Sequence, residues 1–139
     1  MREIEFRGKS KLTGKWVYGN LIVKKTKRQI ETLEEELYYY KYSIQHLNKN
    51  KKYTSTETIE ETVGQYTGLK DKNGKKIYEG DIIYVIPEDE IAFILWDKET
   101  ARYIIKFKGW CADFDNYYGK ELEAIGNLLD NSELLAEKE

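Results

Sequence analysis

Short apolar runs, each bounded by turn-forming residues, recur along most of this chain. Ile4 and Phe6 alternate with charged neighbours, and residues 15–23 form a longer run that bends at Gly19. In the second half, apolar runs occupy residues 81–86, 91–96, 102–108 and 121–125. Short strands in succession, without alternating helices, predict a mainly β fold with a small barrel or curled sheet in the C-terminal part.

Residues 24–45 contain two patterns of apolar residues, one typical of a helix and one typical of a strand. Apolar residues lie at helical spacing at Ile30, Leu33 and Leu37. Residues 38–45, in contrast, form an alternating pattern rich in tyrosine that favours a strand. We predict a short helix or loop followed by a strand. The alternative is a helix that continues through Tyr40 and Ile44, and such helical content would make the fold α+β.

A polar stretch over residues 46–62 divides the chain. It is rich in Asn, Lys, Thr and Glu and holds few apolar residues, which is typical of a solvated loop. We therefore expect an N-terminal β-rich arm or subdomain over residues 1–61, which includes the short helix and this connector. A compact β-barrel should follow over residues 62–139. Within it we expect a long loop at residues 109–120 and a short terminal helix that begins at Ser132.

The dipeptide Asn73-Gly74 is the strongest local signal in the sequence. Asn-Gly favours a two-residue hairpin turn in which both central residues take a positive φ. We expect the arms around Leu69 and Ile77 to pair antiparallel across this turn.

Charge is unevenly distributed along the 139 residues, although the formal net charge is only −2. The first 28 residues hold nine Lys or Arg against two Glu, a net of +7. The remainder holds 14 basic and 23 acidic residues, a net of −9. The basic N-terminal segment could bind an anionic partner such as nucleic acid. Alternatively, it could bind the acidic remainder of the chain, either within one molecule or between subunits.

The counts of cysteine and histidine exclude several classes of site. A single cysteine forms no internal disulfide, and a single histidine excludes the usual His-rich zinc and iron sites. Cys111 and His46 lie in different segments, so we do not expect a nucleophilic pair. No glycine-rich phosphate-binding loop occurs. We expect no enzyme activity, no cofactor, no catalytic or metal-binding residue and no small-molecule substrate.

Two pairs of carboxylates are the remaining candidates for chemistry. Asp113 and Asp115 have a spacing that suits a hard cation, but this spacing is also common in extended loops. Glu79 and Asp81 flank the start of an apolar strand. We expect them to accept hydrogen bonds from backbone N–H groups of the adjoining turns.

The block over residues 62–83, TVGQYTGLKDKNGKKIYEGDII, resembles the signature of the YopX family. The resemblance extends to Arg2–Phe6, Trp16–Gly19, Ala124–Asn127 and Glu133–Leu135, whereas residues 24–60 depart from it. It implies an uncharacterised protein of bacteriophages and prophages, with a mainly β fold and a C-terminal barrel of the Src-homology-3 (SH3) type. It implies no catalytic residues.

These observations favour a non-enzymatic accessory protein of the phage type that acts through protein–protein contacts. We expect self-association, an additional unidentified protein partner, and a cytoplasmic location in the bacterial host. No apolar run approaches the roughly 20 residues of a membrane span, so no membrane contact is expected. The alternative is nucleic-acid binding by the basic N-terminal segment and exposed aromatic residues. The residues expected on either surface are Lys24, Lys25, Lys27, Arg28, Tyr38, Tyr40, Tyr42, Trp110, Tyr117 and Tyr118.

Overall fold

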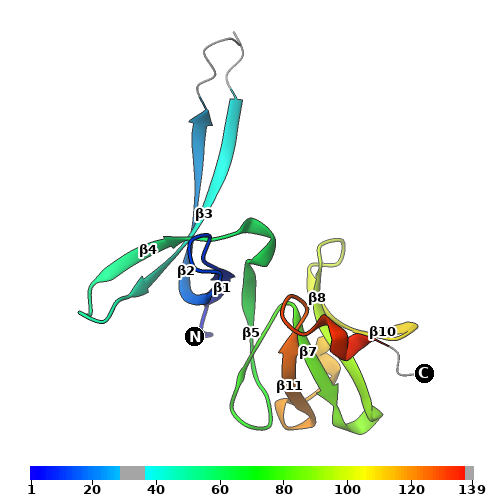
Figure 1. Ribbon diagram of the computed structural model, residues 1–139. Coiled ribbons are helices and arrows are strands. Elements are labelled where there is room, and N and C mark those ends of the chain that lie inside the picture. The colour runs from blue at the N-terminus through cyan, green and yellow to red at the C-terminus, as the bar shows by residue number, and fades with distance from the viewer. Residues whose placement is uncertain (29–36, 137–139) are drawn as a thin grey trace. The chain divides into compact units, whose positions relative to one another are not determined.

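The computed structural model describes residues 1–28 and 37–136 (Figure 1). Regular structure in these residues consists of antiparallel strands and short 3-10 turns, so the prediction of a mainly β fold is confirmed. Contacts divide the chain into an N-terminal unit, residues 4–64, and a C-terminal unit, residues 65–139 together with residues 1–3. The helical spacing at Ile30 and Leu33 falls outside the described residues.

The N-terminal unit contains four antiparallel strands in the order β4-β3-β2-β1. They are β1 (Phe6–Lys9), β2 (Trp16–Arg28), β3 (Leu37–Leu47) and β4 (Tyr53–Glu57). The strand predicted over residues 38–45 is confirmed and is longer than expected. β2 also continues five residues beyond Val23, and the distal part of β2 and β3 extends past β1 and β4 as a two-stranded ribbon (Figure 1).

The prediction of a solvated connector over residues 46–62 is wrong, because these residues include β4 and the 3-10 turn η1 (Glu60–Thr62). Asn48 closes the turn that joins β3 to β4. Its Oδ1 accepts the backbone N–H groups of Asn50 and Lys52, at 2.9 and 3.1 Å. The alternating Thr and Ser residues of β4 are polar, yet the β-branched threonines favour an extended backbone at the edge of the sheet.

The C-terminal unit is built from two short paired strands and a five-stranded antiparallel sheet. The short strands are β5 (Gly64–Lys70) and β6 (Lys76–Tyr78). The sheet has the order β10-β9-β8-β7-β11. Its strands are β7 (Asp81–Val85), β8 (Glu90–Asp97), β9 (Arg102–Phe107), β10 (Trp110–Asp113) and β11 (Leu122–Asn127). The barrel of the SH3 type is not confirmed, because β10 and β11 lie at opposite edges of this sheet and do not close it.

Two further elements of this unit differ from the sequence-based expectation. Residues 109–120 are not a continuous loop, since β10 pairs with β9 and two 3-10 turns follow: η3 (Phe114–Asn116) and η4 (Gly119–Glu121). The terminal helix is a single 3-10 turn, η5 (Ser132–Leu135). Between β7 and β8, Pro87 lies in another such turn, η2 (Ile86–Glu88), where it interrupts the extended backbone.

The core of the C-terminal unit lies on one face of the sheet. Alternate residues of β7, β8 and β9 are fully buried there, together with residues of β6 and β11: Ile77, Ile83, Val85, Ala92, Ile94, Ile105 and Leu122. Phe107 and Phe114 complete the cluster. Burial with period two shapes the pattern of β8 and β9, whereas the run of β7 is continuous because Ile82, on its other face, is also fully buried.

The hairpin between β5 and β6 confirms one part of the Asn73-Gly74 prediction and corrects another. The arms are antiparallel, and Gly74 has a φ of +78°. Asn73 does not have a positive φ, so the two-residue turn is wrong. Asp71 N–H instead bonds the carbonyl of Lys75 at 2.8 Å, which leaves a three-residue loop with the left-handed glycine in third place.

Candidate functional site

The residues singled out from the sequence lie in two units. Seven of them belong to the β2–β3 ribbon of the N-terminal unit: Lys24, Lys25, Lys27, Arg28, Tyr38, Tyr40 and Tyr42. Trp110, Tyr117 and Tyr118 belong to the C-terminal unit. Each group is a candidate surface of its own unit.

Strand register assigns the side chains of the ribbon to two faces. Lys25 pairs with Tyr40 and Lys27 pairs with Tyr38, and paired residues project to the same side of a sheet. We call this side the Tyr40 face: Val23, Lys25, Lys27, Tyr38, Tyr40 and Tyr42. The opposite side is the Tyr39 face: Lys24, Thr26, Arg28, Leu37, Tyr39 and Lys41.

Both faces of the ribbon carry exposed aromatic or aliphatic groups. Tyr38, Tyr39 and Tyr40 are 49%, 47% and 57% exposed, and Val23 is 47% exposed. The ammonium group of Lys25 lies 4.4 Å from the ring centre of Tyr38, a distance that suits a cation–π contact. Described residues of β2 and β3 include five cations and no Asp or Glu, so the ribbon has a positive potential in its described part.

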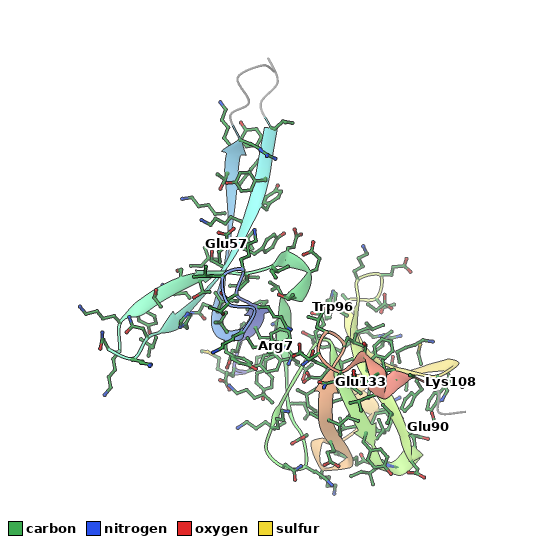
Figure 2. The ribbon with its side chains drawn as sticks, viewed as in Figure 1. Arg7, Glu57, Glu90, Trp96, Lys108 and Glu133 are labelled. Carbon is green, nitrogen blue, oxygen red and sulfur yellow. The ribbon has the colours of Figure 1, made fainter. Side chains whose placement is uncertain are left out.

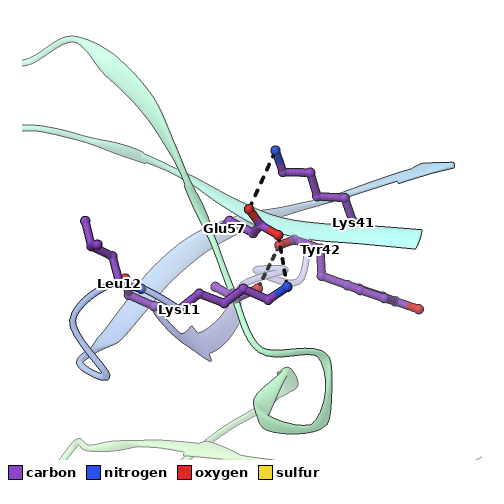
Figure 3. A network of polar contacts seen from close by, with 7 residues as sticks. Lys11, Leu12, Lys41, Tyr42 and Glu57 are labelled. Carbon is purple, nitrogen blue, oxygen red and sulfur yellow. Dashed lines mark hydrogen bonds and ion pairs between the residues drawn. The ribbon is translucent and has the colours of Figure 1, made fainter. Parts of the chain in front are cut away.

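An ion-pair network fixes the base of the ribbon (Figure 3). Lys11 Nζ lies 3.0 Å from Glu57 Oε1, and Lys41 Nζ lies 3.6 Å from Glu57 Oε2. The hydrogen bond from Lys11 lowers the pKa of the Glu57 carboxyl, and Lys41 acts in the same direction. Tyr42 hydrogen-bonds the carboxylate of Glu60, which raises the pKa of the Tyr42 phenol. These contacts order the proximal end of the ribbon.

A second group of cations occupies the turn between β3 and β4. Lys49, Lys51 and Lys52 are exposed, and the adjacent Tyr53 is 70% exposed. The surface predicted from the sequence does not include these residues, because a polar stretch of this kind is typical of a connector. The run of three lysines in four positions beside a tyrosine was the available signal.

The aromatic residues of the C-terminal unit have acidic neighbours. Trp110 stacks on Phe107 with a centroid distance of 4.0 Å, and its Nε1–H donates to Glu90 at 3.3 Å. The Tyr117 hydroxyl donates to Glu88 at 3.1 Å. Burial, the bond to Glu88 and nearby carboxylates raise the pKa of Tyr117 to about 12. This negative environment is unfavourable for a polyanion, so the surroundings of Trp110 and Tyr117 differ chemically from the basic ribbon.

The C-terminal unit also has an open groove of about 820 Å³ next to these aromatic residues. Ile91, Phe93 and Leu135 supply apolar lining. Glu90 and Lys108, both labelled in Figure 2, place opposite charges in the groove wall. None of the residues predicted from the sequence lines this groove.

Two of the candidate carboxylates, Asp81 and Asp113, have structural partners. Asp81 Oδ2 accepts the backbone N–H of Tyr78 at 2.7 Å, as the sequence predicted. Asp113 forms an ion pair with Arg102 at 3.3 Å, and Asp115 lies in η3. Within residues 1–28 and 37–136, no group of three or more His, Cys, Asp or Glu side chains is placed to hold a metal ion. His46 and Cys111 belong to different units.

The part of the chain that the structure describes contains no helix with the length and apolar character needed to cross a membrane.

Comparisons with known proteins agree with the family resemblance. The solved crystal structure of protein EF1440 from Enterococcus faecalis is similar to this chain, with 22% sequence identity and a TM-score of 0.53. The match covers 98% of this chain and 100% of EF1440, and at this identity it supports the fold alone. No curated protein matches the sequence. The family model described as YopX protein matches residues 5–136. The chain therefore belongs to the YopX family.

Proposed function

We propose that this protein is a non-enzymatic binding module that self-associates through the Tyr40 face of its β2–β3 ribbon. The observation that carries this proposal is the exposure of that face. Tyr38, Tyr40 and Val23 are each about half exposed, on a ribbon that extends past the neighbouring strands. A two-stranded ribbon in water is marginally stable without a layer packed against it.

A second copy of the chain supplies such a layer. A half-exposed tyrosine retains roughly 100 Å² of accessible surface, and covering it contributes about 2.5 kcal/mol at roughly 25 cal/mol per Å². Tyr38 and Tyr40 both gain from a two-fold contact, because the same patch is used on each subunit. Tyrosine is also enriched at protein interfaces, whereas the lysines of this face belong at a polar rim.

Light scattering over a range of concentrations tests self-association. The chain should have a mass that is a multiple of 16.5 kDa, and the double variant Tyr38→Ser/Tyr40→Ser should shift towards the monomer. The control is Tyr118→Ser, which removes a tyrosine that is 72% exposed in the C-terminal unit and should leave the mass unchanged. A wild-type chain that stays monomeric at the highest concentration would contradict the proposal.

A second candidate function is nucleic-acid binding, and the absence of Asp and Glu from the described parts of β2 and β3 favours it. The sequence places four glutamates between these strands, which weakens the attraction for a polyanion at residues 29–36. The cations of the strands and of the β3–β4 turn still attract a polyanion.

The double variant Lys24→Gln/Lys41→Gln should have a lower affinity for labelled DNA or RNA, and its affinity should depend less on salt concentration. Affinity that does not change with salt would contradict this function.

A further inference from the structure

The Tyr39 face continues beyond the ribbon across three strands. Side chains alternate along β3, so Ser43, Gln45 and Leu47 share the side on which Tyr39 and Lys41 lie. Across the sheet, Leu47 pairs with Tyr53 of β4, and Ser43 pairs with Ile22 of β2. These residues form one sheet face that runs from the ribbon to the β3–β4 turn.

This sheet face is exposed near both of its ends, whereas the opposite face is exposed in the ribbon but buried at the base of the ribbon. Ile44 projects to the opposite side and is fully buried. On the open side, Tyr39 is 47%, Leu47 55% and Tyr53 70% exposed. Aromatic rings are therefore accessible near both ends of the face.

The charges of this face suit a polyanion. Lys24, Arg28 and Lys41 lie towards the ribbon end, and Lys49, Lys51 and Lys52 occupy the turn at the other end. Among the described residues that β2, β3 and β4 place on this side, the single carboxylate is Glu57. Its ion pairs with Lys11 and Lys41 neutralise it (Figure 3).

The dimensions of the face suit a single strand. Tyr39 and Leu47 are eight positions apart on β3, which corresponds to about 26 Å at roughly 3.3 Å per residue. That length accommodates a site of roughly four to eight nucleotides. A single strand is favoured over a duplex, because bases of a duplex are not free to stack on tyrosine.

We propose that this open sheet face binds single-stranded nucleic acid. Tyr39 and Tyr53 stack on bases, and the lysines of the β3–β4 turn contact phosphates. This inference rests on the second candidate function and specifies its ligand. It does not involve the Tyr40 face, so self-association and nucleic-acid binding are separable.

Fluorescence anisotropy tests the proposal with three labelled probes: oligothymidine and oligouridine of about 12 nucleotides, and a DNA duplex of the same length. Both single strands should bind more tightly than the duplex. The variant Tyr39→Ala/Tyr53→Ala should weaken single-strand binding about tenfold or more, because stacking contributes about 1–3 kcal/mol per base. Tyr118→Ala is the control and should bind like the wild type.

A lysine variant tests the phosphate contacts. Changing Lys49, Lys51 and Lys52 to Gln should reduce the slope of log K against log salt by about two, since each contact to a single strand contributes about 0.7. The matched control changes Lys98, Lys108 and Lys120 to Gln, which removes the same charge from the C-terminal unit. Circular dichroism melting curves should show that all variants remain folded.

The outcomes separate this inference from the function on which it rests. Tighter binding of the duplex, or an unchanged affinity of the tyrosine variant, overturns the single-strand platform and leaves nucleic-acid binding in place. No binding of any probe at low salt overturns both. A preference for oligothymidine or oligouridine identifies DNA or RNA as the ligand.

Discussion

Replacing Asp71 by alanine should lower the free energy of unfolding of the C-terminal unit by about 3 kcal/mol or more. The Asp71 side chain is 6% exposed and accepts three backbone N–H groups, all at 2.9 Å. Two of them, from Asn73 and Lys75, belong to its own hairpin, and the third belongs to Ala124 of β11. Alanine would leave these donors without an acceptor, at a cost of about 1–3 kcal/mol for each one that stays buried.

Chemical denaturation followed by tryptophan fluorescence measures this effect. Asp71→Asn should also destabilise the unit, because its Oδ1 can serve the hairpin while its amide nitrogen cannot accept from Ala124. The control is Asp115→Ala, which removes an exposed carboxylate from η3. If Asp71→Ala lowers the free energy of unfolding no more than Asp115→Ala does, the three hydrogen bonds do not stabilise the fold.

The same carboxyl predicts the pH dependence of stability. Burial raises the pKa of Asp71, but the backbone N–H groups of Ala124, Lys75 and Asn73 together lower it below the ordinary value. A lowered pKa in the folded state stabilises the fold above the pKa of the unfolded chain, and this contribution is lost as pH falls through the folded-state value. The wild type should therefore lose more stability on acidification below about pH 4 than Asp71→Ala.

Replacing Gly19 by alanine should destabilise the N-terminal unit by about 3 kcal/mol, since overpacking costs about 1–3 kcal/mol and more where backbone must move. A Cβ atom at Gly19 would lie 2.0 Å from the carbonyl oxygen of Gln45 and 3.3 Å from a methyl group of Ile44. Both neighbours belong to β3, so the substitution would force β2 and β3 apart at the base of the ribbon.

Hydrogen exchange is the sharper measurement for Gly19→Ala, because it reports the β2–β3 amides directly. Protection of these amides should fall, while that of the C-terminal core around Ile94 and Ile105 should be retained. Asn20→Ala is the matched control, at the adjacent exposed position of the same strand. Unchanged protection in Gly19→Ala would contradict the close approach of the two backbones.

Local sequence determined most of the strands. Apolar runs predicted β7, β8, β9 and β11, since a strand with one buried face repeats with period two and a strand buried on both faces, such as β7, is continuously apolar. Gly74 was predictable for the same kind of local reason, because a left-handed backbone favours a residue without Cβ. The basic and tyrosine-rich segments of the candidate surface were likewise visible as composition.

Two edge strands, β4 and β10, were not predicted from the sequence. β4 and β10 lie at sheet edges, where one side of each strand is unpaired and many side chains face solvent. Their polar composition therefore resembles that of loops, and their extended backbone is set by the neighbours that pair with them, β3 and β9. The lysines beside β4 were overlooked for this reason.

Tertiary structure alone decided which candidate groups act together. Strand register placed Tyr38 and Tyr40 on one face and Tyr39 on the other, because a shift of one residue would exchange the two faces. Chain folding also placed Trp110 and Tyr117 beside carboxylates and brought Ala124 to Asp71, 53 positions away. Composition gives the kinds of side chain that the protein carries, whereas long-range pairing fixes their neighbours and therefore their charge environment and their partners.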